Sequence, residues 1–383
     1  MKVVYLITTK GHGKGGHFHS LNTVANALGR VHDVYVINVG VQCSPSLDSS
    51  NYKISFVKYK GYDFVGTFFK LQKIVNKLQP DAIHAFDVES FAFGRLLSIK
   101  LKQPSYLNKC GGPNPKLYYP KANNIVLFSH ENKLFFDNCK KYQGVNTVLI
   151  PNRVLPVEID KARVVAFQEK HKITTEKTIL RIARIGNHYH QSILQGINLA
   201  KWLVEQGCNV KFILLGTIQS NEVYNHVLEF IDQNNMSRHV IVETEDEYTQ
   251  NASNVLSIGD IVVGTGRNFM EAASLDKVLL VPYLDDKYPL LVNNENFNQV
   301  FKTNFSPRTK IANYNSNLNL IAIKDVIDNT IKGESRDWFD KNFNVIEAVN
   351  KYTELYKTSG KRKFFVLDIV LNILYSIKGL VLK

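Results

Sequence analysis

One candidate for a functional site is a loop between a β-rich run and a helix. Residues 264–268 read GTGRN after an apolar run that ends at Val263, and a glutamate follows in the first turns of the helix. A helix N-terminus and a guanidinium attract a diphosphate, and a carboxylate accepts hydrogen bonds from ribose hydroxyls. The alternative is a glutamate that only complements the helix dipole. The segment predicts a nucleotide site made by Gly264, Gly266, Arg267, Asn268 and Glu271.

A second glycine-rich loop, residues 10–16 (KGHGKGG), follows the first apolar run and opens a helix. Glycines let the backbone approach a ligand closely, and a helix N-terminus favours an anion. The spacing is neither the dinucleotide-binding G-x-G-x-x-G nor a Walker A loop, because no Lys-Ser/Thr pair follows. A strand-to-helix loop without a ligand is the alternative. We expect Gly15, Gly16 and His17 to contact a phosphate or an acceptor molecule.

Composition limits which partners the protein is expected to bind and in which compartment it is expected to work. The 383 residues carry 47 Lys and Arg against 34 Asp and Glu, and this charge of +13 suits an anionic partner such as a nucleotide diphosphate or a phospholipid surface. No recognisable nucleic-acid-binding module is present, so nucleic acid is not an expected partner. The four scattered cysteines and the absence of a signal-peptide pattern predict a cytoplasmic protein. His-x-His pairs without nearby Cys or carboxylate clusters predict no metal site.

The elements that would position these loops follow from apolar patterning. Short β-rich runs alternate with helical patterns, which predicts parallel sheets with helices on both faces. The first series of runs is Val3–Ile7, Val34–Asn38, Ile54–Val57, Ala82–Ala85, Ser105–Leu107, Ile125–Phe128 and Val148–Ile150. The second series is Ile179–Ala183, Val210–Leu215, Val240–Val242, Ile261–Val263 and Val278–Val281. We therefore expect two Rossmann-like lobes with the site in an interlobe cleft, beyond the carboxyl ends of the strands.

Two helical patterns end the chain. One apolar stripe predicts a single helix within residues 336–360, formed by Phe339, Phe343, Ile346, Val349, Tyr352 and Tyr356. Residues 361–383 carry five basic groups against one acid, and their polar positions fall within an arc of about 80°. That arc consists of Asp368, Asn372, Ser376, Gly379 and Lys383. A basic amphipathic helix of this kind suits a membrane surface, and packing on the protein itself or on a second subunit is the alternative.

The segment Glu271-Ala272-Ala273 resembles the second half of E-G-[FY]-G-x-x-x-x-E-A-x-A, the donor-binding motif of family-4 GT-B glycosyltransferases. Other pieces follow in the order of that family and cover most of residues 1–357. They are the glycine pair at 15–16, IPNRV at 150–154, LRIAR at 180–184, the strand and glycine turn at 212–216, and IGD at 258–260. The chain departs from the family at Val263, where a first glutamate would stand, and at Tyr189 and His190, where a lysine is expected.

The resemblance implies a GT-B fold with a C-terminal crossover helix that returns to the N-terminal lobe. Residues 1–160 would bind the acceptor, and residues 161–335 would bind a nucleotide-sugar. Arg184 would hold the donor diphosphate, with Gly216 in the turn beside it. The expected enzyme is a metal-independent, hexosyltransferase-type glycosyltransferase without a cofactor, because arginines and helix dipoles offset the charge of the leaving diphosphate in this family. No residue matches a catalytic base, and UDP and GDP are not distinguished.

As implied by the resemblance, the acceptor is a glycan or a lipid-linked glycan, and the pathway is bacterial surface-polysaccharide biosynthesis. A lipid-linked acceptor would place the enzyme on the inner face of the cell membrane. A nucleotide-sugar epimerase of GT-B fold is one alternative, and it would consume donor without an acceptor. A non-catalytic protein that binds nucleotide-sugars or glycans is another, and it would never turn over.

Overall fold

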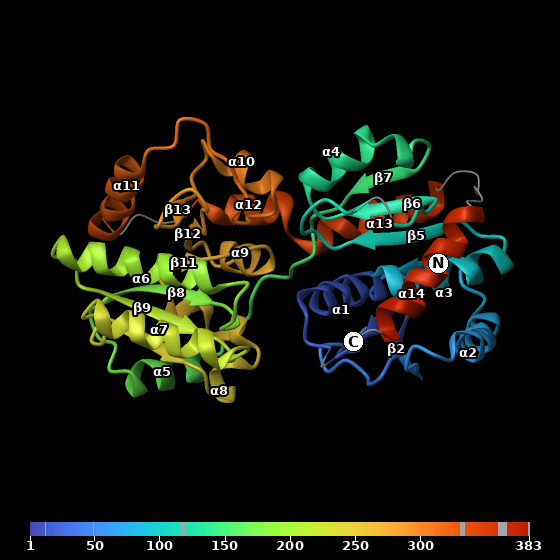
Figure 1. The fold of residues 1–383 in the computed structure, drawn as a ribbon, viewed down its shortest axis with the longest axis horizontal. Helices are drawn as coiled ribbons and strands as arrows, with labels where there is room; N and C mark the ends of the chain where they lie inside the picture. The colour runs from blue at the N-terminus through green and yellow to red at the C-terminus, as the bar shows by residue number, and fades with distance from the viewer. Residues whose placement is uncertain (12, 49, 117–118, 330–333, 359–365, 382–383) are drawn as a thin grey trace. The chain divides into compact units, whose positions relative to one another are not determined.

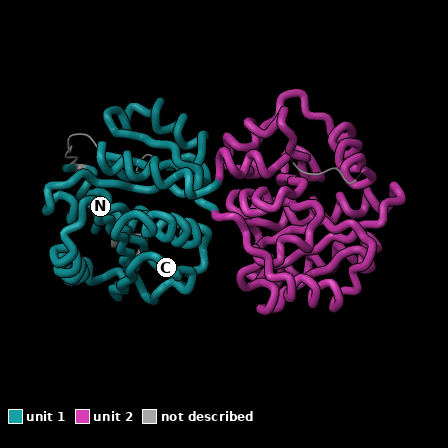
Figure 2. Tube along the Cα trace, turned by 180° about the vertical axis from the view of Figure 1, so that it is seen from behind, with its two compact units in different colours: residues 1–154, 344–383 teal, residues 155–343 magenta. Residues whose placement is uncertain are grey.

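The computed structural model describes residues 1–383 except 12, 49, 117–118, 330–333, 359–365 and 382–383 (Figure 1). The chain divides into two compact units (Figure 2). Unit 1 consists of Met1–Val154 and Asn344–Lys383, and unit 2 is Leu155–Phe343. Each unit has its own sheet, so the expectation of two α/β lobes is confirmed.

The sheet of unit 1 is parallel, in the order β3-β2-β1-β4-β5-β6-β7. The chain leaves β1 toward one edge and resumes at β4 toward the other, so these two strands form the topological switch point. Each strand lies within two residues of its predicted bounds. The strands are β1 (Lys2–Thr9), β2 (Asp33–Gly40), β3 (Lys53–Lys58), β4 (Ala82–Ala85), β5 (Ser105–Lys109), β6 (Asn124–Leu127) and β7 (Asn146–Leu149).

Helices cover both faces of this sheet, as its buried strands require (Figure 1). Two of them begin at the carboxyl ends of the strands at the switch point, α1 after β1 and α3 after β4. The helices are α1 (Gly16–Gly29), α2 (Phe64–Leu78), α3 (Val88–Lys100), α4 (His130–Asn138), the 3-10 helix η1 (Lys140–Tyr142), α13 (Val345–Thr358) and α14 (Val366–Val381).

Unit 2 repeats the arrangement, with strand order β10-β9-β8-β11-β12-β13 and its switch point between β8 and β11. The sheet is parallel except for β13, a short antiparallel strand that sequence patterning missed because it is two residues long. The strands are β8 (Lys177–Ile182), β9 (Val210–Leu215), β10 (Val240–Glu243), β11 (Ile261–Val263), β12 (Val278–Val281) and β13 (Leu290–Leu291).

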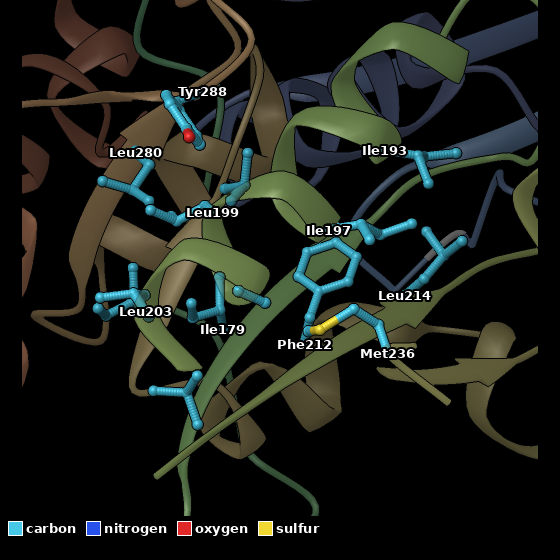
Figure 3. Packing of buried hydrophobic residues seen from close by; sticks show 14 of the residues in the cluster. Ile179, Ile193, Ile197, Leu199, Leu203, Phe212, Leu214, Met236, Leu280 and Tyr288 are labelled. Atoms are coloured by element: carbon cyan, nitrogen blue, oxygen red, sulfur yellow. The ribbon is translucent and has the colours of Figure 1, made fainter. Parts of the chain in front are cut away.

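The core of unit 2 lies between α6 and the sheet (Figure 3). Ile193 and Ile197 of α6 pack against Ile179 of β8 and Phe212 of β9. Burial of such side chains stabilises the fold by about 1.5–3 kcal/mol each. The helices of unit 2 are α5 (Lys161–Lys170), α6 (His190–Glu205), α7 (Asn221–Gln233), α8 (Asp246–Thr249), η2 (Ala252–Ile258), α9 (Arg267–Ala273), α10 (Phe297–Lys302), α11 (Ser316–Asn329) and α12 (Ser335–Asn342).

The prediction of one helix within 336–360 is wrong, because the chain breaks between α12 and α13. The Asn344 side chain accepts a hydrogen bond from the Ile346 N–H at 3.1 Å, as a helix cap does, and the Val345 N–H donates to the Val154 carbonyl. These polar contacts satisfy backbone groups that a continuous helix would use internally. Helix α12 therefore belongs to unit 2, and α13 belongs to unit 1.

Helix α13 is fastened to the sheet of unit 1 by a buried hydrogen-bond chain. The Tyr356 hydroxyl lies 2.8 Å from the Tyr5 hydroxyl and 2.9 Å from His84 Nδ1. Burial lowers the pKa of His84 to about 3, so the imidazole is neutral at physiological pH. One turn earlier, the Tyr352 hydroxyl is buried without a hydrogen-bond partner. Tyr356 therefore satisfies two polar groups of the core, whereas the Tyr352 hydroxyl satisfies none.

Helix α14 docks on α3 through polar side chains. Asp368 accepts a hydrogen bond from the buried Arg95 guanidinium at 2.8 Å and another from the Lys121 N–H at 2.9 Å. The Asn372 amide donates to the Val88 carbonyl at 3.3 Å. These two positions of the predicted polar arc therefore face the protein. The Ser376 side chain, the surroundings of Gly379 and the whole of Lys383 lie outside the described part of the chain.

The opposite side of α14 is apolar and open to solvent. Val366, Val370, Leu371 and Leu374 are between 51% and 71% exposed. The basic positions 361–363 that precede the helix lie outside the described residues. Among the residues that are described, no helix is long and apolar enough to cross a membrane.

We predict that Tyr356→Phe lowers the free energy of unfolding by about 1–3 kcal/mol, because Tyr5 and His84 each lose a buried partner. The matched control Tyr352→Phe removes a buried hydroxyl that has no partner, so its effect should be close to zero or stabilising. Urea unfolding followed by circular dichroism measures both. Equal destabilisation by the two variants would contradict the role given to Tyr356.

Candidate functional site

The carboxyl edge of the sheet in unit 2 gathers most of the predicted site residues. Strands β8 and β11 pair in parallel, with Ile179 opposite Ile261 and Leu180 opposite Val262. The segment after β8 carries Arg184, and the segment after β11 leads through residues 264–266 into α9. In open α/β sheets ligands bind beyond the carboxyl ends of the strands at such a switch point. The two segments therefore stand where a ligand of this fold is expected.

The loop 264–266 needs its glycines for backbone reasons. A Cβ at Gly264 would lie 2.7 Å from Phe269 Cα, which leaves no room for a side chain. Gly266 has φ +50° and ψ −120°, a conformation that L side chains rarely adopt, and its N–H donates to the Asn304 carbonyl at 3.2 Å. The loop consequently turns within three residues and starts α9 directly beside the end of β11.

Glu271 is the buried carboxylate of this edge. It is 7% exposed; its Oε1 accepts a hydrogen bond from Arg267 Nε at 2.6 Å, and its Oε2 accepts one from Ser253 Oγ at 2.7 Å. Because Glu271 is the fifth residue of the seven-residue α9, the alternative of a carboxylate that complements the helix N-terminus is not favoured. A carboxylate has about four acceptor sites, so two remain for further donors.

Ser253 of η2 was not singled out from the sequence. It lies 18 residues before Glu271, and its contact exists only because η2 packs beside α9. A serine within a polar stretch gives no signal of such a contact. Asn268, which the sequence predicts as part of the nucleotide site, has its side-chain Oδ1 buried without a hydrogen-bond partner.

Arg184 lies at the exposed end of the segment after β8. Its guanidinium stacks over the Tyr189 ring at 5.6 Å, and Nη2 is 3.5 Å from the Tyr189 hydroxyl. No described carboxylate forms an ion pair with it, so its charge is available to an anion. Gly216 has a different role, because a Cβ there would lie 1.7 Å from the Ala183 carbonyl oxygen. The close approach of the two backbones accounts for that glycine.

Gly15, Gly16 and His17 lie at the carboxyl edge of the other sheet, in unit 1. Gly15 is the residue before α1, which starts at Gly16 without a side-chain cap. The ring of the half-buried His17 lies tilted against the Phe18 ring, with 4.3 Å between the centroids, and burial lowers the pKa of His17 against the opposing effect of Glu89. An imidazole in this state is neutral at physiological pH and can accept a proton.

Asp87 and Glu89 complete this edge of unit 1. Asp87 caps α3 by accepting from the Ser90 N–H at 2.7 Å and also accepts from the Thr8 N–H at 2.6 Å, so it bridges the ends of β4 and β1. Burial, with the adjacent Glu89 carboxylate, raises the pKa of Asp87 to about 6. Glu89 forms an ion pair with Lys10 of the glycine-rich loop. Asp87 is therefore the N-cap of α3.

Within the described part of the chain, no three His, Cys, Asp or Glu side chains are grouped so that they could hold a metal ion. The imidazoles of His190 and His226 meet at 2.8 Å on the surface, but they form only a pair.

Sequence comparison matches the chain to no family model and to no curated protein. Several solved structures resemble it. A glycosyltransferase from Rickettsia africae has a TM-score of 0.63 at 15% identity, over 94% of this chain and 98% of that one. HepE of Anabaena in complex with UDP-glucose has a TM-score of 0.65 at 12% identity, over 94% and 100%. A UDP-GlcNAc 2-epimerase from Methanocaldococcus jannaschii has a TM-score of 0.56 at 14% identity, over 92% and 100%.

These similarities span nearly the whole of each chain and both sheets. The chain has the GT-B fold. A GT-B fold is the architecture that the motif order implied, with each Rossmann-like unit carrying a switch point at the carboxyl edge of its sheet. Transferases and an epimerase both occur among the similar structures, so the fold by itself does not choose between them.

We predict that Ser253→Ala lowers the free energy of unfolding of unit 2 by about 1–2 kcal/mol, because it removes a hydrogen bond to a buried carboxylate. Ser257→Ala, in the same helix, is the matched control and should change the value by less than about 0.5 kcal/mol. Denaturant unfolding monitored by hydrogen exchange in α9 separates unit 2 from unit 1. A Ser253→Ala protein as stable as the control would refute the contact.

Proposed function

We propose that this protein is a glycosyltransferase that moves a sugar from a nucleotide-diphosphate sugar to a hydroxyl of a glycan or lipid-linked acceptor. The observation that carries the proposal is the buried Glu271 carboxylate, which Arg267 and Ser253 hold at the switch point of a GT-B fold. The structural similarity to glycosyltransferases supports it, and the UDP and UDP-glucose complexes of HepE favour a uridine donor.

Within this proposal, the two unused acceptor sites of Glu271 receive hydrogen bonds from the ribose hydroxyls. The Arg184 guanidinium, unpaired with any described carboxylate, offsets the charge of the diphosphate as it becomes the leaving group. Gly264 and Gly266 let the chain turn tightly from β11 into α9, and in this proposal the donor binds at that turn. The protein would thus supply the positive charge from its own residues.

The acceptor side falls to unit 1, where Asp87 and His17 are the candidate proton acceptors. With a pKa raised to about 6 by burial and by Glu89, Asp87 is ionised at neutral pH yet more basic than an ordinary carboxylate. His17 is neutral there and stands next to the glycine pair. Either group can take the proton that the attacking hydroxyl loses.

A nucleotide-sugar epimerase is the second candidate, favoured by the similarity to the UDP-GlcNAc 2-epimerase. The buried Val263, at the position where the resemblance places a first glutamate, removes one carboxylate that would contact the sugar. The two functions differ in their need for an acceptor. A transferase releases nucleoside diphosphate only with an acceptor present, whereas an epimerase converts donor alone.

We propose further that α14 brings the enzyme to the inner face of the cell membrane, where a lipid-linked acceptor would be found. Its described polar side chains, Asp368 and Asn372, contact α3, and the apolar residues Val366, Val370, Leu371 and Leu374 are exposed. The sequence KRK precedes the helix, and the chain has a charge of +13. Exposed apolar side chains beside basic ones fit a bilayer that contains anionic lipid. This position suits surface-polysaccharide assembly.

Donor binding tests the site. We expect isothermal titration to detect UDP or GDP, with at least tenfold weaker binding in Glu271→Gln, because hydrogen bonds to a charged carboxylate contribute about 1.5–3 kcal/mol. The matched control is Glu247→Gln, which changes an exposed glutamate of the same unit. Unchanged affinity in Glu271→Gln would place the nucleotide elsewhere.

Turnover then separates the three functions. Radiolabelled UDP-glucose, GDP-mannose and UDP-GlcNAc are incubated with and without a lipid extract of bacterial membranes. We expect label to enter the lipid fraction and nucleoside diphosphate to be released only with the extract. A changed sugar without the extract would establish an epimerase, and donor binding without any turnover would establish a binding protein.

Co-sedimentation with vesicles tests the α14 surface. We expect the full chain to bind phosphatidylglycerol vesicles more tightly than phosphatidylcholine vesicles, and Val370→Ser/Leu371→Ser/Leu374→Ser to lose at least tenfold in affinity. Leu318→Ser/Ile321→Ser removes comparably exposed apolar residues from α11 in unit 2 and should bind as the parent does. A dimer without lipid that only the α14 variant loses would show instead that a second copy covers this face.

A further inference from the structure

A fully buried arginine lies under the switch point of unit 2. Arg181 stands in β8, and its side chain is on the same face as Ile179, toward α6. The guanidinium donates to the Val263 carbonyl at 3.0 Å and to Ser192 Oγ at 3.1 Å, and its Nε has no hydrogen-bond partner. Each partner is neutral. The donor segment described above uses Arg184, three residues later, and leaves Arg181 without a role.

The charge of Arg181 is not balanced by the protein. Among the described residues, no carboxylate forms an ion pair with it. The Tyr189 ring, 5.8 Å from Cζ, offers only a weak cation–π contact. Burial lowers the pKa of Arg181 to about 10, so the group stays protonated at neutral pH. An uncompensated buried cation costs several kcal/mol, and a fold tolerates that cost where a function uses the charge.

A second positive feature coincides with the first. Ser192, which accepts from Arg181, is the third residue of α6, a sixteen-residue helix. The first turn of a helix carries a partial positive charge, and α6 has neither a side-chain cap nor an acidic residue there, although the His190 N–H donates to the Gly186 carbonyl at 3.1 Å. The helix dipole repels a cation that lies beside the N-terminus of the helix. Two positive groups that repel each other are both stabilised by an anion beside them.

The position of Arg181 indicates where such an anion would bind. Val263 is the last residue of β11 and Arg181 is the last but one of β8, so the guanidinium joins the two strands of the switch point at their carboxyl ends. The loop 264–266 starts on one side of it, and α6 starts on the other. An anion at the N-terminus of α6 would lie next to this charge, and a buried charge is screened less by water than a surface charge is.

We infer that Arg181 and the N-terminus of α6 form a phosphate subsite, in which Arg181 is the buried counter-charge for the diphosphate of the donor. The inference rests on the proposed function and deepens it. Arg181 acts as a positioning residue: it raises the affinity for phosphate groups through its charge, while Arg184 reaches the ligand from the surface. The subsite recognises the phosphates and is indifferent to base and sugar, so inorganic pyrophosphate is a ligand as well.

The experiment compares charge with shape at position 181. Binding of UDP, GDP, inorganic pyrophosphate and uridine is measured by titration in the full chain and in Arg181→Met, Arg181→Gln and Arg181→Lys. We expect Arg181→Met and Arg181→Gln to bind the phosphate-bearing ligands at least tenfold more weakly than the parent does. Arg181→Lys should bind them within about threefold of the parent, and the affinity for uridine should be the same in all four proteins. Arg238→Met, an exposed arginine of the same unit, is the control and should bind as the parent does.

Thermal unfolding of the same proteins removes the structural explanation. If Arg181 only connected β11 to α6, Arg181→Lys and Arg181→Met would lose that connection equally. Both variants would then unfold at a lower temperature than the parent. We expect Arg181→Met to be as stable as the parent or more stable, because a buried unpaired charge is replaced by an apolar side chain of similar length. Arg181→Gln keeps a polar donor at the position and serves if the methionine protein does not fold.

The outcomes separate this inference from the function on which it rests. Unchanged binding in Met and Gln, or failure of Lys to restore it, overturns the subsite and leaves the glycosyltransferase proposal intact. Pyrophosphate binding that depends on Arg181, without binding of any nucleoside diphosphate, supports the subsite and overturns the nucleotide donor. A parent protein that binds none of the phosphate ligands overturns both.

Discussion

The parallel pairing of β8 with β11 is the constraint on which the rest of the candidate site depends. The chain leaves these neighbouring strands in opposite directions, so the segments after them diverge and leave space at the carboxyl edge. Through this pairing, the segments that carry Arg184, the loop 264–266 and Glu271 follow neighbouring strands at one edge of the sheet, although up to 87 residues separate them in the sequence. The pairing of β1 with β4 does the same in unit 1, where it joins the glycine-rich loop to Asp87.

Buried charge distinguishes the two halves of the switch point in unit 2. The Glu271 carboxylate is paired with Arg267 and hydrogen-bonded to Ser253, so the protein itself satisfies it and holds it in one orientation. The Arg181 guanidinium has only neutral acceptors, so its charge remains for something else. In the proposed function, the carboxylate binds hydroxyl groups and the cation binds phosphates. Such a combination fits a nucleotide-diphosphate ligand better than a neutral sugar or peptide.

Sequence patterning predicted the strands, because buried parallel strands read as continuous apolar runs. It also predicted close backbone approach at the glycines, because a glycine has no side chain to prevent it. It missed Ser253, whose contact with Glu271 depends on tertiary packing, and it assigned the donor diphosphate to the motif position Arg184 without a role for Arg181. The apolar stripe through Phe343 hid the helix break, which arises from the Asn344 cap and a bridge to Val154. In α14 the pattern showed the two faces, and the contacts of Asp368 and Asn372 with α3 showed which one turns inward.

The central claim is that a nucleotide-sugar binds at the carboxyl edge of the sheet in unit 2, and amide hydrogen exchange tests it most directly. Exchange is followed in the full chain with and without saturating UDP-glucose or GDP-mannose. The account predicts that one of these ligands slows exchange in residues 184–193 and 264–273, with no change in residues 233–240 at the opposite edge of the sheet. Protection confined to other segments, or none with any nucleotide-sugar, would contradict the account.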